Sequence, residues 1–89
     1  MKNKPAAARW FVYIGRCADG TLYTGVTTDV ARRIREHNAS TKGARYTSGR
    51  RPITLIYKER RASRAAALVR EAAIKRLTRA QKLALAKAV

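Results

Sequence analysis

The sequence has little cysteine, little acid and no long apolar run. Its 89 residues include one cysteine, Cys17, so the chain forms neither an intrachain disulfide nor a cysteine zinc cluster. A lone cysteine suits a reducing compartment, and we expect a cytoplasmic protein. No apolar stretch is long enough to span a bilayer, and no signal peptide is visible. We therefore expect no membrane association.

Acidic residues are scarce beside basic ones. Lys and Arg total 21 whereas Asp and Glu total 5, which gives a formal net charge of +16. A compact chain of that charge repels itself, and a polyanion relieves the repulsion. Nucleic acid is the leading partner, because basic groups displace condensed counterions from phosphates. An anionic membrane surface is the rival, but the basic residues are spread along the chain rather than gathered on one amphipathic helix. A basic protein without catalysis is the other alternative.

The length predicts one small domain. We expect residues 1–8 to be a disordered basic lead, residues 9–83 to form the domain and residues 84–89 to end a C-terminal helix. The patterning predicts a hairpin turning at Asp19-Gly20, then a helix, a third strand and two more helices. The order β-β-α-β-α-α is typical of an α+β fold, with a small three-stranded antiparallel sheet flanked by three helices.

Capping residues and apolar runs set the expected boundaries. Thr27 or Thr28 is expected to cap the first helix, Ser63 the second, and Thr78 the third within a capping box. A loop over residues 38–51 is rich in Gly, Ser, Thr and basic residues, and such long loops are often functional. The expected strands cover residues 10–17, 21–26 and 52–57, and the helices reach about residue 38, about residue 77 and the chain end.

Two tyrosines stand on the strands of the predicted hairpin. Tyr13 and Tyr23 are expected near opposite one another and on one face. Gly25, near the end of the second strand, indicates a bend or a close approach of the backbone. Aromatic cross-strand pairs are common packing, yet a phenol hydroxyl can also orient a water molecule or take its proton. The composition leaves both interpretations open.

Three further side chains are candidates for chemistry. Arg33 and His37 project from one face of the first helix because they are four residues apart. They either converge on a phosphate, whose negative charge a planar guanidinium stabilises, or His37 is a partly buried residue at a helix end. Glu71 lies on or beside the core-facing stripe of the second helix, where a carboxylate is costly unless it is paired or binds a metal. A salt bridge to one of the many arginines is the simpler interpretation.

The ordered set of these residues resembles the GIY-YIG nuclease domain. Its two strand motifs correspond to Phe11-Val12-Tyr13 and Tyr23-Thr24-Gly25, and the resemblance covers about residues 10–82. Phe11 stands where the first motif has glycine, and Thr24 stands in the middle of the second motif. Thr24 is expected to point away from Tyr23 by strand alternation, so neither difference removes a candidate catalytic group.

The resemblance implies a metal-dependent endonuclease that hydrolyses DNA phosphodiester bonds in repair or recombination. It implies one divalent ion, Mg²⁺ or Mn²⁺, held by Glu71, and no small-molecule cofactor. Arg33 would neutralise charge on the phosphate. Tyr23 would orient or deprotonate the attacking water, with Tyr13 and His37 assisting. Positive surroundings are expected to lower the pKa of a tyrosine in such a site. The alternative is a nucleic-acid-binding module of the same fold with little or no catalytic activity.

Nucleic acid, with DNA as the expected form, would be gripped by side chains outside the catalytic set. Most of them belong to the basic loop, where an aromatic ring either stacks on a base or packs the loop. We expect the protein to act as a monomer or weak dimer. The expected binding residues are Lys42, Arg45, Tyr46, Arg50, Arg51 and Lys75.

Overall fold

Three strands and three helices follow one another in the order that the sequence predicts. The computed structural model describes residues 9–39 and 49–88, so the expected lead at residues 1–8 lies outside the described residues. The sheet is antiparallel with strand order β2-β1-β3, which confirms the predicted α+β fold. The elements are β1 (Trp10–Cys17), β2 (Leu22–Thr27), α1 (Val30–Asn38), β3 (Ile53–Arg61), α2 (Arg64–Lys75) and α3 (Arg79–Lys87).

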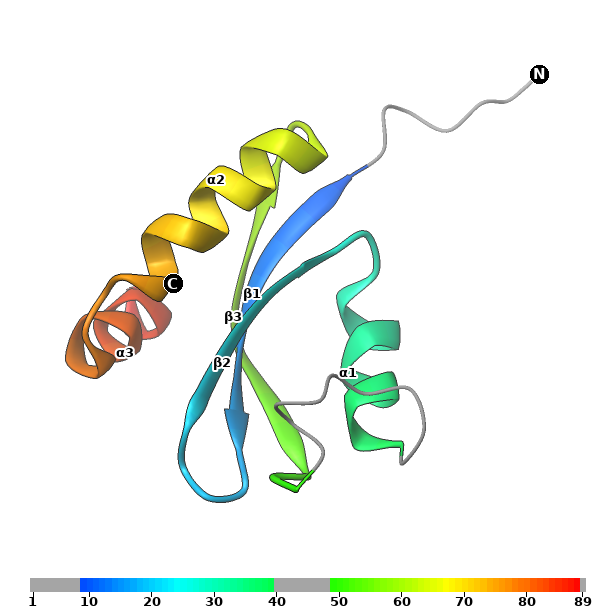
Figure 1. Cartoon of the computed structure of the whole chain (residues 1–89), viewed down its shortest axis with the longest axis vertical. Helices are drawn as coiled ribbons and strands as arrows, with labels where there is room; N and C mark the ends of the chain where they lie inside the picture. Colours follow the sequence, from blue (N-terminus) through cyan, green and yellow to red (C-terminus); the bar gives the residue numbers. More distant parts are fainter. Residues whose placement is uncertain (1–8, 40–48, 89) are drawn as a thin grey trace.

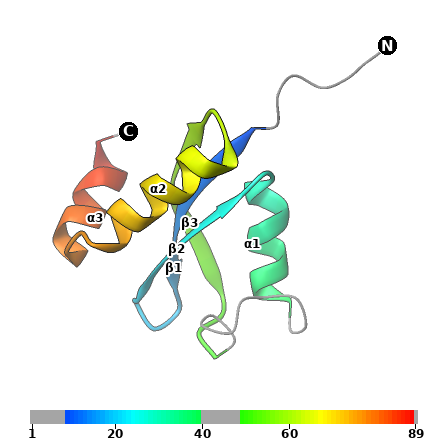
Figure 2. The ribbon, with the colours of Figure 1, turned by 45° about the horizontal axis from the view of Figure 1, so that its top comes forward.

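Helices cover both faces of the sheet. α1 lies on one face, and α2 and α3 lie on the other, as Figure 1 and Figure 2 show from two directions. Side chains alternate along a strand, so Val12 and Ile14 of β1 point toward α2. There they form a buried core with Ala67 and Ile74. Tyr13, between Val12 and Ile14, therefore faces α1.

The hairpin between β1 and β2 turns where the sequence predicts. Gly20 has a φ of +88°, a left-handed conformation that favours glycine. Asp19 stabilises the turn by accepting from the backbone N–H and the hydroxyl of Thr21. The turn therefore fixes the register in which β2 returns along β1.

A bulge in β3 shapes the other side of the sheet. Ile14 pairs with Tyr57 and Gly15 pairs with Leu55, which leaves Ile56 as an extra residue. Because of this extra residue, Ile56 and Tyr57 both pack against the core cluster. β3 also continues to Arg61, so the predicted end at residue 57 is wrong. Antiparallel pairing with β1 extends β3 through residues 58–61. These residues are polar, so the apolar pattern of the sequence did not predict that they belong to the strand.

The predicted cap of α1 is also wrong. Asp29 is the N-cap, and its side chain accepts from the backbone N–H of Arg32 at 3.0 Å. Thr27 instead ends β2 and accepts from the backbone N–H of Asp29 through its hydroxyl. The caps predicted for α2 and α3, Ser63 and Thr78, are confirmed. α2 ends at Lys75, two residues before the predicted end, because the cap of α3 follows so closely.

Candidate active site

Tyr13 and Tyr23 lie on neighbouring strands, on the face of the sheet that α1 covers. Tyr13 pairs with Gly25, and Tyr23 pairs with Gly15, so the two tyrosines are diagonal cross-strand neighbours. Their ring centroids are 6.2 Å apart. The shared face agrees with the prediction, and the diagonal offset comes from the register that the hairpin turn sets.

Gly25 leaves the space that Tyr13 occupies. A Cβ at Gly25 would lie 2.7 Å from the Tyr13 hydroxyl oxygen and 2.9 Å from its Cζ, closer than real Cβ atoms come to other atoms. The Tyr13 side chain therefore lies against the β2 backbone at a position where other residues carry a side chain. This is the close approach that Gly25 indicated, and it holds the hydroxyl in one place.

His37 joins the two tyrosines from the last turn of α1. Its Nε2 is 2.7 Å from the Tyr13 hydroxyl, and its ring meets that of Tyr23 at an edge, with centroids 5.0 Å apart. His37 is 0% exposed and Tyr13 is 1% exposed. Tyr23 is half-buried. Of the three rings, Tyr23 is therefore the one that solvent reaches.

Asn38 fixes the end of α1 and so the position of His37. Its side-chain amide accepts from the backbone N–H of Ile53 at 2.7 Å and donates to the Ile53 carbonyl at 3.1 Å. This pair of hydrogen bonds ties the last residue of α1 to the first residue of β3. Asn38 is not among the site residues predicted from the sequence. The one signal that could have indicated its role is an asparagine at the end of an expected helix.

Burial sets the protonation states of Tyr13 and His37. Burial first, and then the charge of Arg33, lowers the pKa of His37 from 6.5 to about 4, so the imidazole is neutral at pH 7. Burial, and then the neighbouring Tyr23, raises the pKa of the Tyr13 phenol above its ordinary value. Arg33 acts to lower the pKa of Tyr13, as positive charge is expected to, but the cost of desolvating the phenolate outweighs this attraction.

Arg33 lies between a carboxylate and the buried phenol. Its Nη1 is 3.1 Å from Glu36 Oε1, and its guanidinium also hydrogen-bonds the Tyr13 hydroxyl. A guanidinium only donates, so the Tyr13 oxygen accepts from Arg33 and the phenolic proton can be given to His37 Nε2. In that arrangement His37 carries its own proton on Nδ1. The Arg33 side chain is 27% exposed, so an anion at the surface can approach it.

Glu71 is presented by α2 and acts on the same phenol. After burial and Tyr23, the negative charge of its carboxylate also acts to raise the pKa of Tyr13. The Glu71 side chain is 18% exposed, and its Oε2 is 3.4 Å from Lys75 Nζ. The expected salt bridge is therefore present, but with a lysine one helical turn along rather than an arginine. Within residues 9–39 and 49–88, no three His, Cys, Asp or Glu side chains form a group that could hold a metal ion.

Comparison with known protein families shows where this arrangement belongs. Residues 9–84 match the family described as the GIY-YIG catalytic domain. The chain belongs to the GIY-YIG family. This confirms the resemblance inferred from the two strand motifs, and it places the protein in a nuclease superfamily.

Relatives of this GIY-YIG protein occur in bacteria and archaea. A UPF0213 protein of Desulfotalea psychrophila is 61% identical over 86 residues, which cover 97% of this chain and 76% of the relative. A UPF0213 protein of Halobacterium salinarum is 57% identical over 74 residues, covering 83% of this chain and 95% of the relative. The solution NMR structure of a UPF0213 protein from Bacillus halodurans shares 46% identity with a TM-score of 0.56, and the match covers 89% of this chain and 83% of that one. These names state no activity.

Two arginines predicted to bind nucleic acid have contacts that hold the GIY-YIG domain together. Arg50 Nε is 3.1 Å from Asp19 Oδ2 in the hairpin turn. Arg51 donates to the carbonyl of Ala39, just after α1. Both therefore lie at the base of the loop that follows α1. The other predicted loop residues, Lys42, Arg45 and Tyr46, lie outside the described residues.

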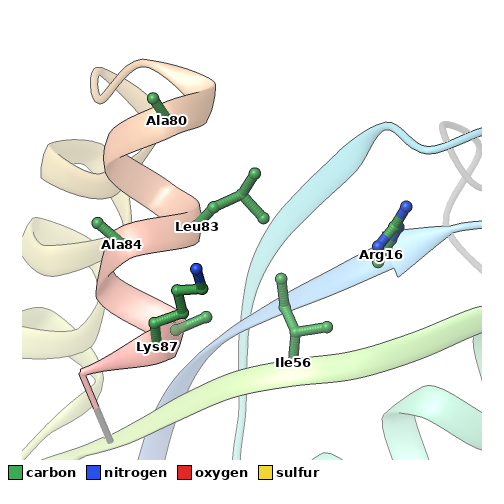
Figure 3. Close-up of a pocket in the computed structure, with 7 residues that line it drawn as sticks. Arg16, Ile56, Ala80, Leu83, Ala84 and Lys87 are labelled. Carbon is green, nitrogen blue, oxygen red and sulfur yellow. The ribbon is translucent and has the colours of Figure 1, made fainter.

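An apolar pocket lies between α3 and the sheet, on the face opposite Tyr13. Its volume is about 530 Å³, and none of the five candidate catalytic residues lines it. Figure 3 shows Leu83 of α3 and Ile56 of β3 reaching toward this space, with Arg16 of β1 beyond them. α3 has no fully buried residue, and its Leu85 is partly buried against the core cluster. None of the described helices is both long and apolar enough to cross a membrane.

Proposed function

We propose that this protein is a divalent-metal-dependent endonuclease that hydrolyses DNA phosphodiester bonds in repair or recombination. The contact between Tyr13, Tyr23 and His37 supports the proposal most, because it gathers three candidate groups from β1, β2 and α1. We further propose that residues 9–83 form the nuclease domain, and that the protein acts in the cytoplasm as a monomer or weak dimer. Membership of the GIY-YIG family supports the reaction class.

In this proposal Tyr23 orients or deprotonates the attacking water. Tyr23 is half-buried, whereas Tyr13 and His37 offer water almost no surface. The roles of the three rings, which the sequence left open, can therefore be divided by their exposure. Tyr13 and His37 act as a buried pair that positions the Tyr23 ring.

Arg33 stabilises negative charge on the phosphate under attack. A planar guanidinium suits phosphate oxygens because it donates parallel hydrogen bonds and keeps its charge. The ion pair with Glu36 at 3.1 Å holds the partly exposed Arg33 beside the Tyr13 hydroxyl before substrate arrives. Preorganisation of this kind avoids rearranging the donor during the reaction.

Glu71 is the residue that would hold the divalent ion. A single partly exposed carboxylate fits Mg²⁺ or Mn²⁺ in such a site, because these sites use one or two carboxylates together with waters and substrate phosphates. When bound, the ion supplies stabilisation of charge on the phosphate and on the leaving oxygen. Lys75 neutralises Glu71 in the described structure, and it would turn to the nucleic acid when the carboxylate takes another cation.

A nucleic-acid-binding module of the same fold, with little or no turnover, is the second candidate. The Glu71–Lys75 ion pair favours it, because a carboxylate already neutralised by lysine has less attraction for a divalent ion. The net charge of +16 supports binding under either candidate.

The two candidates separate in a cleavage assay. Plasmid, branched and flapped DNA are incubated with the protein and Mg²⁺ or Mn²⁺, and Glu71→Ala is compared with Asp19→Asn, a control carboxylate in the hairpin turn. We expect cleavage by the wild type and by D19N, and a rate at least about 100-fold lower for E71A. Absence of cleavage on every substrate, or equal cleavage by E71A, contradicts the endonuclease. Salt-dependent binding without turnover supports the module instead.

A further inference from the structure

We propose that the outer edge of β2 carries a second site, a basic groove that holds the sugar–phosphate backbone of one nucleic-acid strand beside the bond to be cut. This proposal rests on the nucleic-acid substrate proposed above. The groove consists of two adjoining pockets where β2 meets the end of α2 and the start of α3. Leu22 and Lys82 line both pockets, which have volumes of about 280 and 180 Å³.

The β2 groove leads from the candidate active site toward the hairpin turn. Tyr23 and Lys75 line the pocket nearer the site, and Thr21 and Arg79 line the other. Lys75 is also the ion-pair partner of Glu71, so the groove begins next to the proposed metal carboxylate. A nucleic-acid strand whose scissile phosphate lies at Tyr23 would therefore continue directly into the groove.

The lining of the β2 groove carries charge of one sign. Lys75, Arg79 and Lys82 contribute three cations, and among the described residues no Asp or Glu lines either pocket. β2 is an edge strand, because only β1 pairs with it among the described strands. An edge strand presents unpaired backbone N–H groups, which can donate to phosphate oxygens as the basic side chains do.

A buried hydroxyl in the same pocket lacks a hydrogen-bond partner. Thr24 is 4% exposed, it lines the pocket with Tyr23, and its Oγ1 makes no hydrogen bond within the described residues. Buried polar groups are nearly always paired, so an unpaired one calls for an explanation. Valine would fill the same space without an unpaired oxygen. A hydroxyl at this place fits a partner that binds in the groove, a phosphate oxygen or a water attached to it.

An acidic peptide also complements positive charge, but the position of the groove favours a nucleic-acid strand. The groove is continuous with Tyr23, whose ring contacts His37 in the candidate active site. A substrate strand therefore reaches the groove without a second molecule. The proposal would be overturned if binding of a labelled poly-glutamate peptide depended on Lys82 while binding of DNA did not.

The first test compares two lysines on α3. Lys82 lines the groove, whereas Lys87 lies five residues further on and lines the apolar pocket on the other side of α3 instead. Binding of a fluorescein-labelled DNA single strand, and of the matching duplex, is measured for Lys82→Ala and Lys87→Ala over a range of salt concentrations. We expect K82A to bind several-fold more weakly and the slope of log K against log salt to fall by about 0.7 to 0.9, whereas K87A keeps the wild-type slope. Equal slopes for the two variants overturn the groove.

The second test uses Thr24→Val, which removes the unpaired hydroxyl and keeps the branched shape. We expect weaker DNA binding together with a melting temperature that is unchanged or higher. A lower melting temperature with unchanged DNA binding shows that the hydroxyl serves the fold, and it overturns this part of the proposal.

The two tests also separate the groove from the endonuclease. If K82A lowers the salt slope of DNA binding but the wild type cuts no DNA, the groove stands and the endonuclease fails. If the wild type cuts DNA while K82A and T24V bind as it does, the endonuclease stands and the groove fails.

Discussion

The Tyr13 hydroxyl and His37 Nε2 lie 2.7 Å apart in the interior, although the two residues are 24 positions apart in the sequence. This hydrogen bond joins β1 to α1 and satisfies two polar groups that are almost completely buried. It makes the candidate site part of the structure that supports the fold. Substitutions at these residues therefore affect stability as well as chemistry, and Tyr23 provides the comparison that separates the two effects.

Tyr13→Phe is expected to destabilise the protein by about 1–3 kcal/mol, because it removes the buried hydroxyl that hydrogen-bonds both His37 Nε2 and Arg33. Tyr23→Phe is expected to change stability by less than about 1 kcal/mol, because the Tyr23 side chain is half-buried and keeps its ring contacts. Both variants should lose cleavage activity. Urea unfolding with parallel cleavage assays measures both effects. Full cleavage by Y23F would remove the water-orienting role from Tyr23.

The free energy of unfolding should fall as the pH is lowered from about 6.5 to about 4. The pKa of His37 falls from 6.5, the ordinary value for an exposed imidazole, to about 4 in the fold, so the unfolded chain takes up a proton first as the pH is lowered. The loss is of the order of 3 kcal/mol and is complete below the folded pKa. His37→Gln should remove this part of the pH dependence. The groups around the imidazole are Tyr13, Tyr23, Arg33 and Glu36. These neighbours are the same in the wild type and in H37Q, so a difference between the two pH profiles comes from His37. An identical pH profile for H37Q would contradict the buried neutral imidazole.

Gly25→Ala should displace Tyr13, because the added Cβ would lie 2.7 Å from the Tyr13 hydroxyl oxygen. We expect destabilisation of about 1–3 kcal/mol and loss of cleavage. Gly49→Ala is the matched control, since a Cβ at Gly49 meets no atom within 4 Å, and it should be neutral or slightly stabilising. Equal melting temperatures for the two variants would show that Tyr13 does not depend on the glycine.

Glu59 should be the acidic residue with the largest effect on folding. Its side chain is 14% exposed, and it accepts from Tyr57 at 2.5 Å and from Arg70 at 3.0 Å while also pairing with Arg61. Burial acts to raise the pKa of Glu59, but these hydrogen bonds hold it below its ordinary value. The stabilisation is therefore present above the unfolded pKa and is lost as the pH falls through the lower folded pKa.

Glu59→Gln is thus expected to cost about 2 kcal/mol at pH 7 and less in acid, where the wild-type carboxyl is protonated as well. Arg32→Ala removes an exposed pairing with Glu36 and should cost less than about 1 kcal/mol at either pH. Thermal unfolding at neutral and acid pH gives both values. If E59Q lowered the free energy of unfolding by as much in acid as at pH 7, the result would contradict the charged network.

Much of the fold could be predicted because it follows from local chemistry. Asp19-Gly20 fixes the hairpin, and Ser63 and Thr78 begin helices where their side chains cap the backbone. The end of β3 could not be predicted in this way. Glu59 and its basic neighbours belong to the strand because β1 pairs with them and α2 supplies Arg70, and both contacts connect residues distant in the sequence.

The candidate site could be predicted as a set of residues but not as a geometry. The hairpin register, together with alternation along each strand, places Tyr13 and Tyr23 on one face. The distance from Tyr13 to His37 depends on how α1 crosses the sheet, and Asn38 sets this through Ile53, 15 residues away. The exposure that distinguishes Tyr23 from Tyr13 likewise arises only once α1 covers the sheet.

A crystal structure of the protein with Mn²⁺, located by its anomalous scattering, would show whether Glu71 holds the divalent ion. We expect one Mn²⁺ ion bound by the Glu71 carboxylate on the side of Tyr23 and Arg33, with Lys75 Nζ moved away from its present 3.4 Å contact with Glu71. A Glu71→Gln crystal should show no ion there. Manganese bound elsewhere while Glu71 keeps its contact with Lys75, at a concentration that supports DNA cleavage, would show that Glu71 is not the metal ligand.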